Sequence, residues 1–98
     1  MFIVFLRFSD NKANAGQFMP GHNAWIEKGL EDGVFLLVGS LQPQQGGAIL
    51  AHGIDRDTLE QRVEEDPFVQ QNVVTAEILE ITPGKADPKL EFLLDASK

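Results

Sequence analysis

The N-terminal segment constrains the fold most, because residues 2–8 (FIVFLRF) are apolar on both faces of an extended chain. Side chains alternate between the two faces of a strand. Four of them would share one face: Phe2, Val4, Leu6 and Phe8. Ile3 and Phe5 would lie on the other face, so this strand needs cover on both sides. We therefore expect a buried strand within a sheet that has two protected faces.

The patterns that follow alternate between helical and extended character. Residues 11–17 show no period and predict a loop, and a helical pattern starts near Pro20 and ends before Gly33. Apolar runs predict further strands at residues 34–38, 48–52 and 73–81, with a turn at 42–47. A second helix should start after Asp55 or Asp57 and bury Leu59 and Val63.

This order is strand, helix, strand, strand, helix, strand. It predicts an α+β fold of the ferredoxin-like βαββαβ type, with an antiparallel sheet and both helices on one face. We expect this domain to span residues 1–82. Because two helices cover only one face of the sheet, a second subunit is the expected cover for the other face. The C-terminal tail, residues 83–98, has an apolar patch that we expect to pack on this partner: Leu90, Phe92, Leu93 and Leu94.

The charge balance and the composition argue against several classes of partner and of site. The formal net charge is -7, from 15 acidic and 8 basic residues, which disfavours both nucleic acid and an anionic membrane surface. Without cysteine there is no disulfide, thiolate nucleophile or cysteine-based metal site. No run approaches the ~20 apolar residues of a membrane span, and the N-terminal apolar run is too short for a secretion signal. We expect a cytoplasmic homodimer.

Two polar residues lie where helices are expected to begin. His22 follows Pro20-Gly21, and Asp66 opens Asp66-Pro67-Phe68-Val69. An imidazole oriented by a carboxylate is a common general base, and a position near a helix N-terminus would favour the neutral ring. The structural alternatives are a hydrogen-bonded polar residue in a first turn for His22 and a helix cap for Asp66. A cap can still direct its second oxygen toward an imidazole, so the two interpretations of Asp66 are compatible.

Three further residues are candidates for substrate binding. Arg7 would reach a substrate carboxylate or keep its head in water, and Trp25 would line a pocket at its rim or belong to the core. Ser40 would place a hydroxyl at the mouth of a cleft or satisfy its own turn. We expect no metal, because His22 and His52 are far apart and lack partners at ligand spacing. We also expect no nucleotide cofactor, because no Gly-x-Gly-x-x-Gly string follows a strand.

Several local strings resemble the YCII-like family of the dimeric α+β-barrel group. They are the apolar N-terminal strand, His22, the run Gly33-Val34-Phe35-Leu36-Leu37-Val38-Gly39-Ser40, Gly46-Gly47-Ala48, and Asp66-Pro67-Phe68-Val69. The resemblance covers roughly residues 1–82 and implies a dimeric α+β barrel with His22 and Asp66 as the catalytic pair. Two positions depart from the family pattern. Met19 stands where many members have an arginine, and Asn72 stands where a glycine often follows the Asp-Pro string.

Three functions are compatible with these features. The first is a small cofactor-independent enzyme, because the resemblance implies lyase or dehalogenase-type chemistry on cyclic or aromatic-derived acids. In it, His22 would move a proton at carbon and Asp66 would orient the imidazole, leading to isomerisation or loss of a leaving group. The second is a non-catalytic dimeric module that binds a small metabolite or assists another protein. The third is a domain in which the histidine is only structural.

Overall fold

The apolar strand at the N-terminus lies inside a four-stranded sheet of the order β2-β3-β1-β4. A computed structural model describes residues 1–96 of the chain. Its elements are, in order, β1 (Phe2–Phe8), a 3-10 turn (Lys12–Asn14), α1 (Ala15–Glu31), β2 (Phe35–Leu41), β3 (Gly46–Ala51), α2 (Arg56–Glu64), α3 (Pro67–Gln70), β4 (Val74–Glu80), a second 3-10 turn (Pro88–Leu90) and α4 (Phe92–Ala96).

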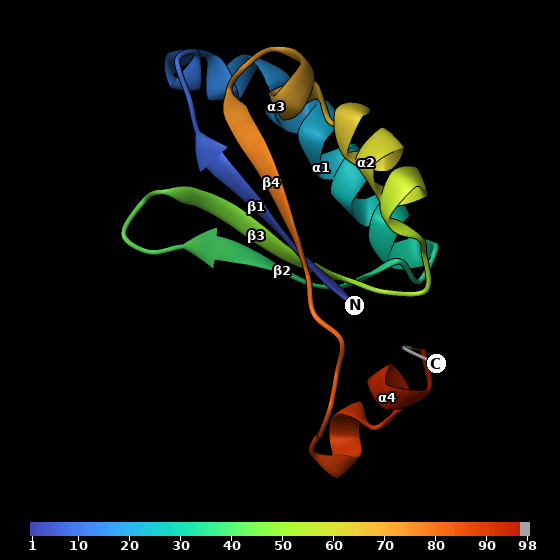
Figure 1. Cartoon of the computed structure of the whole chain (residues 1–98). Coiled ribbons are helices and arrows are strands. Elements are labelled where there is room, and N and C mark those ends of the chain that lie inside the picture. The colour runs from blue at the N-terminus through green and yellow to red at the C-terminus, as the bar shows by residue number, and fades with distance from the viewer. Residues whose placement is uncertain (97–98) are drawn as a thin grey trace.

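All three strand pairs are antiparallel, and β1 pairs with β3 on one side and β4 on the other. The helices α1, α2 and α3 lie together on one face of this sheet (Figure 1). The predicted ferredoxin-like α+β fold is therefore confirmed, with α3 as the short helical turn expected after Asp66. Of the two candidate caps of α2, Asp55 is the one observed, and its side chain accepts a hydrogen bond from the backbone N–H of Thr58. The helix α2 buries Leu59 and Val63 as expected.

The core lies between the helices and the sheet. Its buried side chains come from both layers: Phe2, Val4, Leu6, Trp25, Phe35, Ile49, Ala51, Leu59, Val63, Phe68, Val73 and Val74. Gly29 of α1 has a direct role in this packing, because the ring of Phe35 occupies the space that a β-carbon at position 29 would need. This close approach of helix and strand fixes the C-terminal half of α1 on the sheet.

The start of α1 differs from the prediction. The helix begins at Ala15, not near Pro20, so the expected loop at residues 11–17 is mostly helical. The sequence gives little sign of this because the first turns of α1 bury no residue completely. Pro20 lies inside the helix, where it cannot donate to the carbonyl of Gly16. His22 consequently lies about two turns inside α1, so the expected effect of a helix N-terminus on its ring does not apply.

The strands of the hairpin between β2 and β3 extend further toward the turn than predicted, and the turn itself is shorter. The β2 strand continues to Leu41 and β3 starts at Gly46, so Ser40 belongs to a strand and the connecting turn is residues 42–45. The peptide bond between Gln42 and Pro43 in this turn is cis.

The sheet face that points away from the helices carries a transverse apolar row. The register pairs Leu37 with Leu50, Leu50 with Ile3, and Ile3 with Leu79, so one apolar side chain comes from each strand. Leu37 is 60% exposed and Leu79 is 45% exposed. Within residues 1–96 no second layer covers this face, as Figure 1 shows.

The tail leaves the sheet after β4 and places α4 apart from the other helices (Figure 1). Leu93 is nevertheless buried, and the ring of Phe92 meets the ring of His52 edge-on at a centroid distance of 5.6 Å. Part of the tail therefore contacts the chain's own domain, while Leu90 and Phe92 stay exposed. Whether the tail also packs on a partner stays a prediction.

Candidate active site

His22 and Asp66 lie in contact although 44 residues separate them. The Nδ1 atom of His22 is 2.8 Å from Oδ1 of Asp66, within the range that a hydrogen-bonded pair requires. The Asp66 side chain is completely buried, and the His22 side chain is 12% exposed. The contact forms because α3, which Asp66 precedes, packs against α1, which carries His22. The fold therefore places the two side chains within hydrogen-bond reach, and their catalytic role stays a prediction.

The position of Asp66 follows from the proline after it. A residue before proline avoids the α region, and Asp66 has an extended backbone with φ -68° and ψ 121°. From there its Oδ1 accepts a hydrogen bond of 3.0 Å from the backbone N–H of Phe68 and caps α3. The same oxygen accepts from His22, and not the second oxygen as we expected, so the cap also orients the imidazole. Oδ2 of Asp66 is buried and has no hydrogen-bond partner in the described residues.

Aromatic rings fix the plane of the His22 imidazole. The Phe68 ring stacks on it at a centroid distance of 3.9 Å and an interplanar angle of 5°, and Trp25 lies at 6.0 Å. A carboxylate accepts hydrogen bonds and does not donate them, so Nδ1 carries the hydrogen in the neutral ring. The Nε2 atom then keeps its lone pair. A carboxylate and two rings thus set the orientation of the imidazole, which is the geometry that a general base requires.

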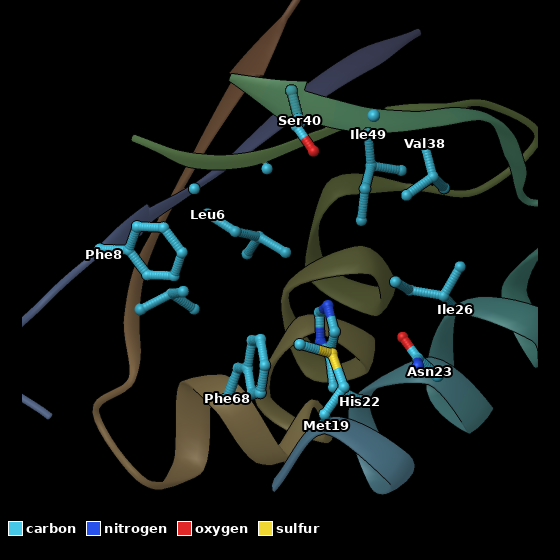
Figure 2. A pocket seen from close by; sticks show the side chains of 15 residues that line it. Leu6, Phe8, Met19, His22, Asn23, Ile26, Val38, Ser40, Ile49 and Phe68 are labelled. Carbon is cyan, nitrogen blue, oxygen red and sulfur yellow. The ribbon is translucent and has the colours of Figure 1, made fainter. Parts of the chain in front are cut away.

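The His22 ring lines a pocket of about 360 Å³ between α1 and the sheet (Figure 2). Most of its wall is apolar and includes Leu6, Phe8, Ile26, Val38, Ile49 and Phe68. Its polar side chains are those of His22, Asn23 and Ser40, and Figure 2 shows the Ser40 hydroxyl pointing into the pocket from the sheet. Glycines at 39, 46 and 47 line it as well. A small, largely apolar ligand fits such a site.

The structure brings one of the three predicted substrate-binding residues to this pocket. Ser40 lines it. Arg7 lies on the opposite sheet face, where it pairs with Glu77 at 2.6 Å and stacks over the Phe5 ring. Trp25 is buried, and its Nε1 donates to the backbone carbonyl of Arg62 at 2.9 Å. Arg7 and Trp25 therefore do not line the pocket, although Trp25 supports the His22 ring from the core side.

Sequence reasoning missed several residues of the pocket wall. Met19, Asn23 and Ile26 line it from α1, and their spacing of four and three residues places them on one helix face with His22. That spacing was available in the sequence, but placing the helix start near Pro20 left Met19 outside the helix. Phe68 could be recognised only from the fold, because it reaches His22 across the contact between α3 and α1.

Among the side chains that the structure describes, no three of histidine, aspartate or glutamate gather closely enough to hold a metal ion. The two-residue pair of His22 and Asp66 alone offers too few ligands for a protein metal site. In the described part of the chain, no helix has the length and apolar character to span a bilayer. His52, the other histidine of the chain, is not among the residues that line the pocket, and its buried Nδ1 has no hydrogen-bond partner in the described residues.

Comparison with known proteins places these features in a family. No curated protein matches the sequence significantly. The fold is similar to that of 5-chloro-2-hydroxyhydroquinone dehydrochlorinase (TftG) from Burkholderia phenoliruptrix AC1100, solved in complex with 2,5-dihydroxybenzoquinone. The TM-score is 0.67 at 14% sequence identity, and the match covers 86% of this chain and 96% of that chain. The YCII-related domain matches residues 1–83, and the chain therefore belongs to the YCII-related family.

Proposed function

We propose that this protein is a small cofactor-independent enzyme that uses His22 as a general base. The observation that carries the proposal is the 2.8 Å contact between His22 and the buried Asp66, with the imidazole at the wall of an apolar pocket. A structural histidine has no need of a cavity beside it. A base does need one, because the proton it removes belongs to a bound molecule.

The proposed step is proton transfer from carbon. Nε2 of His22 takes the proton, and the electron pair of the broken C–H bond forms a new double bond. In an elimination the leaving group departs with its own electron pair; in an isomerisation a proton returns at another carbon. Asp66 holds the ring in the tautomer that leaves Nε2 free and stabilises the imidazolium that forms. General base catalysis of this kind contributes about 100- to 10,000-fold to a rate.

The proposed substrate is a small cyclic or aromatic-derived acid. The pocket volume of about 360 Å³ lies near the lower end for small-molecule sites, and its wall is mostly apolar. TftG, the structural neighbour, acts on a chlorinated hydroxyhydroquinone by its name. Its ring-shaped substrate supports a lyase, isomerase or dehalogenase reaction on a related ring as the first hypothesis to test.

The test compares wild type with His22→Asn. Asparagine can still donate to Asp66 but has no second nitrogen to accept a proton. The assays are chloride release from 5-chloro-2-hydroxyhydroquinone and carbon-bound deuterium incorporation, by NMR in D₂O, into a panel of cyclic and aromatic acids. In the first assay the base takes a hydroxyl proton, a proton adds at the chlorinated carbon, and chloride leaves with the electron pair of the C–Cl bond. We expect turnover in wild type and its loss in His22→Asn, with a melting temperature within a few degrees. Ligand binding without turnover by wild type across the panel would favour the non-catalytic module instead.

We also propose that the enzyme is a homodimer whose sheets pack face to face. The transverse row of Leu37, Leu50, Ile3 and Leu79 supports this, because contiguous exposed apolar side chains usually mark an interface. The exposed side chains of the tail, Leu90 and Phe92, would add to the same assembly.

Analytical ultracentrifugation tests the dimer. Wild type should sediment as a dimer, and Leu37→Lys should shift it to a monomer because the lysine would place a charge in the interface. A wild-type monomer at all concentrations would contradict the proposal.

We also propose a cytoplasmic location. The chain has no cysteine and therefore no disulfide that would need an oxidising compartment.

A further inference from the structure

The wall of the pocket beside His22 contains no aspartate, glutamate, lysine or arginine side chain. An anionic group inside it would lose its hydration without gaining an opposite charge, which is unfavourable. Asp66, completely buried behind His22, would add repulsion. If the substrate is an acid, its acidic group therefore has to lie outside this pocket.

A second depression of about 390 Å³ adjoins the first. The two share Phe8, Ser40 and Gly46, and the second is further lined by polar side chains that include Lys12, Gln42 and Gln44. It lies where the end of β1 and the turn between β2 and β3 approach the 3-10 turn that precedes α1. From this shared wall we infer one cleft, with an apolar inner part at His22 and a polar outer part at Lys12.

Lys12 differs from the other cationic side chains of residues 1–82. Four of them form ion pairs with acidic side chains: Arg7, Lys28, Arg56 and Arg62. Lys12 forms no ion pair within the described part of the chain, and its ammonium lies 4.7 Å from the centroid of the Phe8 ring. Phe8 lines both depressions, so a cation–π contact holds this unpaired charge over their shared wall.

We propose that Lys12 binds the anionic group of the substrate at the outer part of the cleft. The inference rests on the proposed function and narrows its substrate class. The ligand is a cyclic or aromatic ring that lies against His22, with an acidic group on a substituent that extends past Phe8 and Ser40. Ser40 and the glutamines would supply hydrogen bonds beside the ammonium. The chain as a whole has a net charge of -7, which repels anions. A lysine without an ion pair at this position would favour an anionic ligand over an uncharged one at this site alone.

The test measures binding, so it does not depend on turnover. The probes are benzoate, phenylacetate and 3-phenylpropionate, each paired with its uncharged primary amide, titrated calorimetrically at low ionic strength. In wild type, at least one acid should bind roughly two- to fivefold tighter than its amide, because an exposed ion pair contributes about 1 kcal/mol or less. Added salt should reduce this preference.

Three variants assign the preference to Lys12. Lys12→Gln should reduce the ratio of acid to amide affinity to about one, with the affinity for the amide unchanged, and Lys12→Arg should restore the preference. Lys28→Gln removes the same charge from the exposed face of α1, next to Asp32, and should keep the wild-type ratio.

Equal ratios in Lys12→Gln and Lys28→Gln would overturn the proposal, because the effect would then be one of net charge. It would also be overturned if no acid of the panel binds wild type more tightly than its amide. His22→Asn should keep the acid preference even though it removes proton transfer. A failure of the base at His22 and a failure of the anion site at Lys12 therefore give different results.

Discussion

Replacement of Asp66 by alanine tests the structural account of the site most directly. Oδ1 of Asp66 accepts from the backbone N–H of Phe68 and from Nδ1 of His22. Loss of the helix cap costs about 1 kcal/mol. The Nδ1 donor of His22, left without its partner in a side chain only 12% exposed, costs about 1–3 kcal/mol more. Asp66→Ala should therefore destabilise the fold by about 2–4 kcal/mol and lower its melting temperature by roughly 10 °C or more.

A double-mutant cycle with His22→Ala separates the two contributions. The loss of the cap is independent of His22, whereas the hydrogen bond between the side chains is lost in either single variant. Urea unfolding of the four proteins should give a coupling energy of about 1.5–3 kcal/mol, the range for hydrogen bonds to charged groups. Asp66→Asn keeps an oxygen acceptor for Phe68 and should be the mildest change at this position. A coupling energy within error of zero would refute the account, because the two side chains would then not depend on each other.

Three further predictions concern packing, pH and the pocket. Gly29→Ala should destabilise the fold by about 1–2 kcal/mol in urea unfolding, because overpacking against Phe35 outweighs the gain in helix propensity; an unchanged stability would mean that α1 can move away from β2. The hydrogen bond from the backbone N–H of Thr58 lowers the pKa of Asp55 below its ordinary value of 3.8. Asp55→Ala should therefore lower the melting temperature at pH 7, and its difference from wild type should shrink as the pH falls through that lowered pKa; a constant difference down to pH 2 would contradict this. Gly47→Ala should place a methyl group on the pocket side of β3, 3.2 Å from the backbone oxygen of Gly39, and so weaken ligand binding in calorimetry with a small fall in the melting temperature; unchanged ligand binding would contradict the assignment of this pocket.

The order of elements could be predicted because their signals are local. The apolar run of β1, the Asp-Pro string before α3 and the thin stripe of Leu59 and Val63 each specify one element by themselves. The start of α1 could not, because its first turns bury nothing completely and contain Pro20, which is favoured at a first turn. The helix forms there in spite of this signal, with Ala15 and Phe18 partly buried against the core.

The candidate site was predicted to a similar extent. The contact of His22 with Asp66 follows from the order of the elements. The expectation that Arg7 binds substrate did not take into account which face of the strand it occupies. Arg7 shares its parity with Ile3 and Phe5, so it faces away from the helices, and the sequence already contained that information. Ser40 reaches the pocket for the same reason, since it has the parity of Val38 within β2. The stacking of Phe68 on His22 depends on the tertiary contact of α3 with α1, which no local pattern specifies.

The shared oxygen of Asp66 makes the orientation of the proposed base, His22, a consequence of backbone structure. In many sites a carboxylate that orients a histidine has its own freedom of rotation, and further side chains must fix it. Here the proline at position 67 sets the backbone of Asp66, the N–H of Phe68 sets the direction of Oδ1, and the Phe68 ring sets the plane of His22. Three consecutive residues thus control the direction in which Nε2 presents its lone pair. A variant that keeps the carboxylate but changes this turn, such as Pro67→Ala, should therefore impair proton transfer while His22 and Asp66 are both still present.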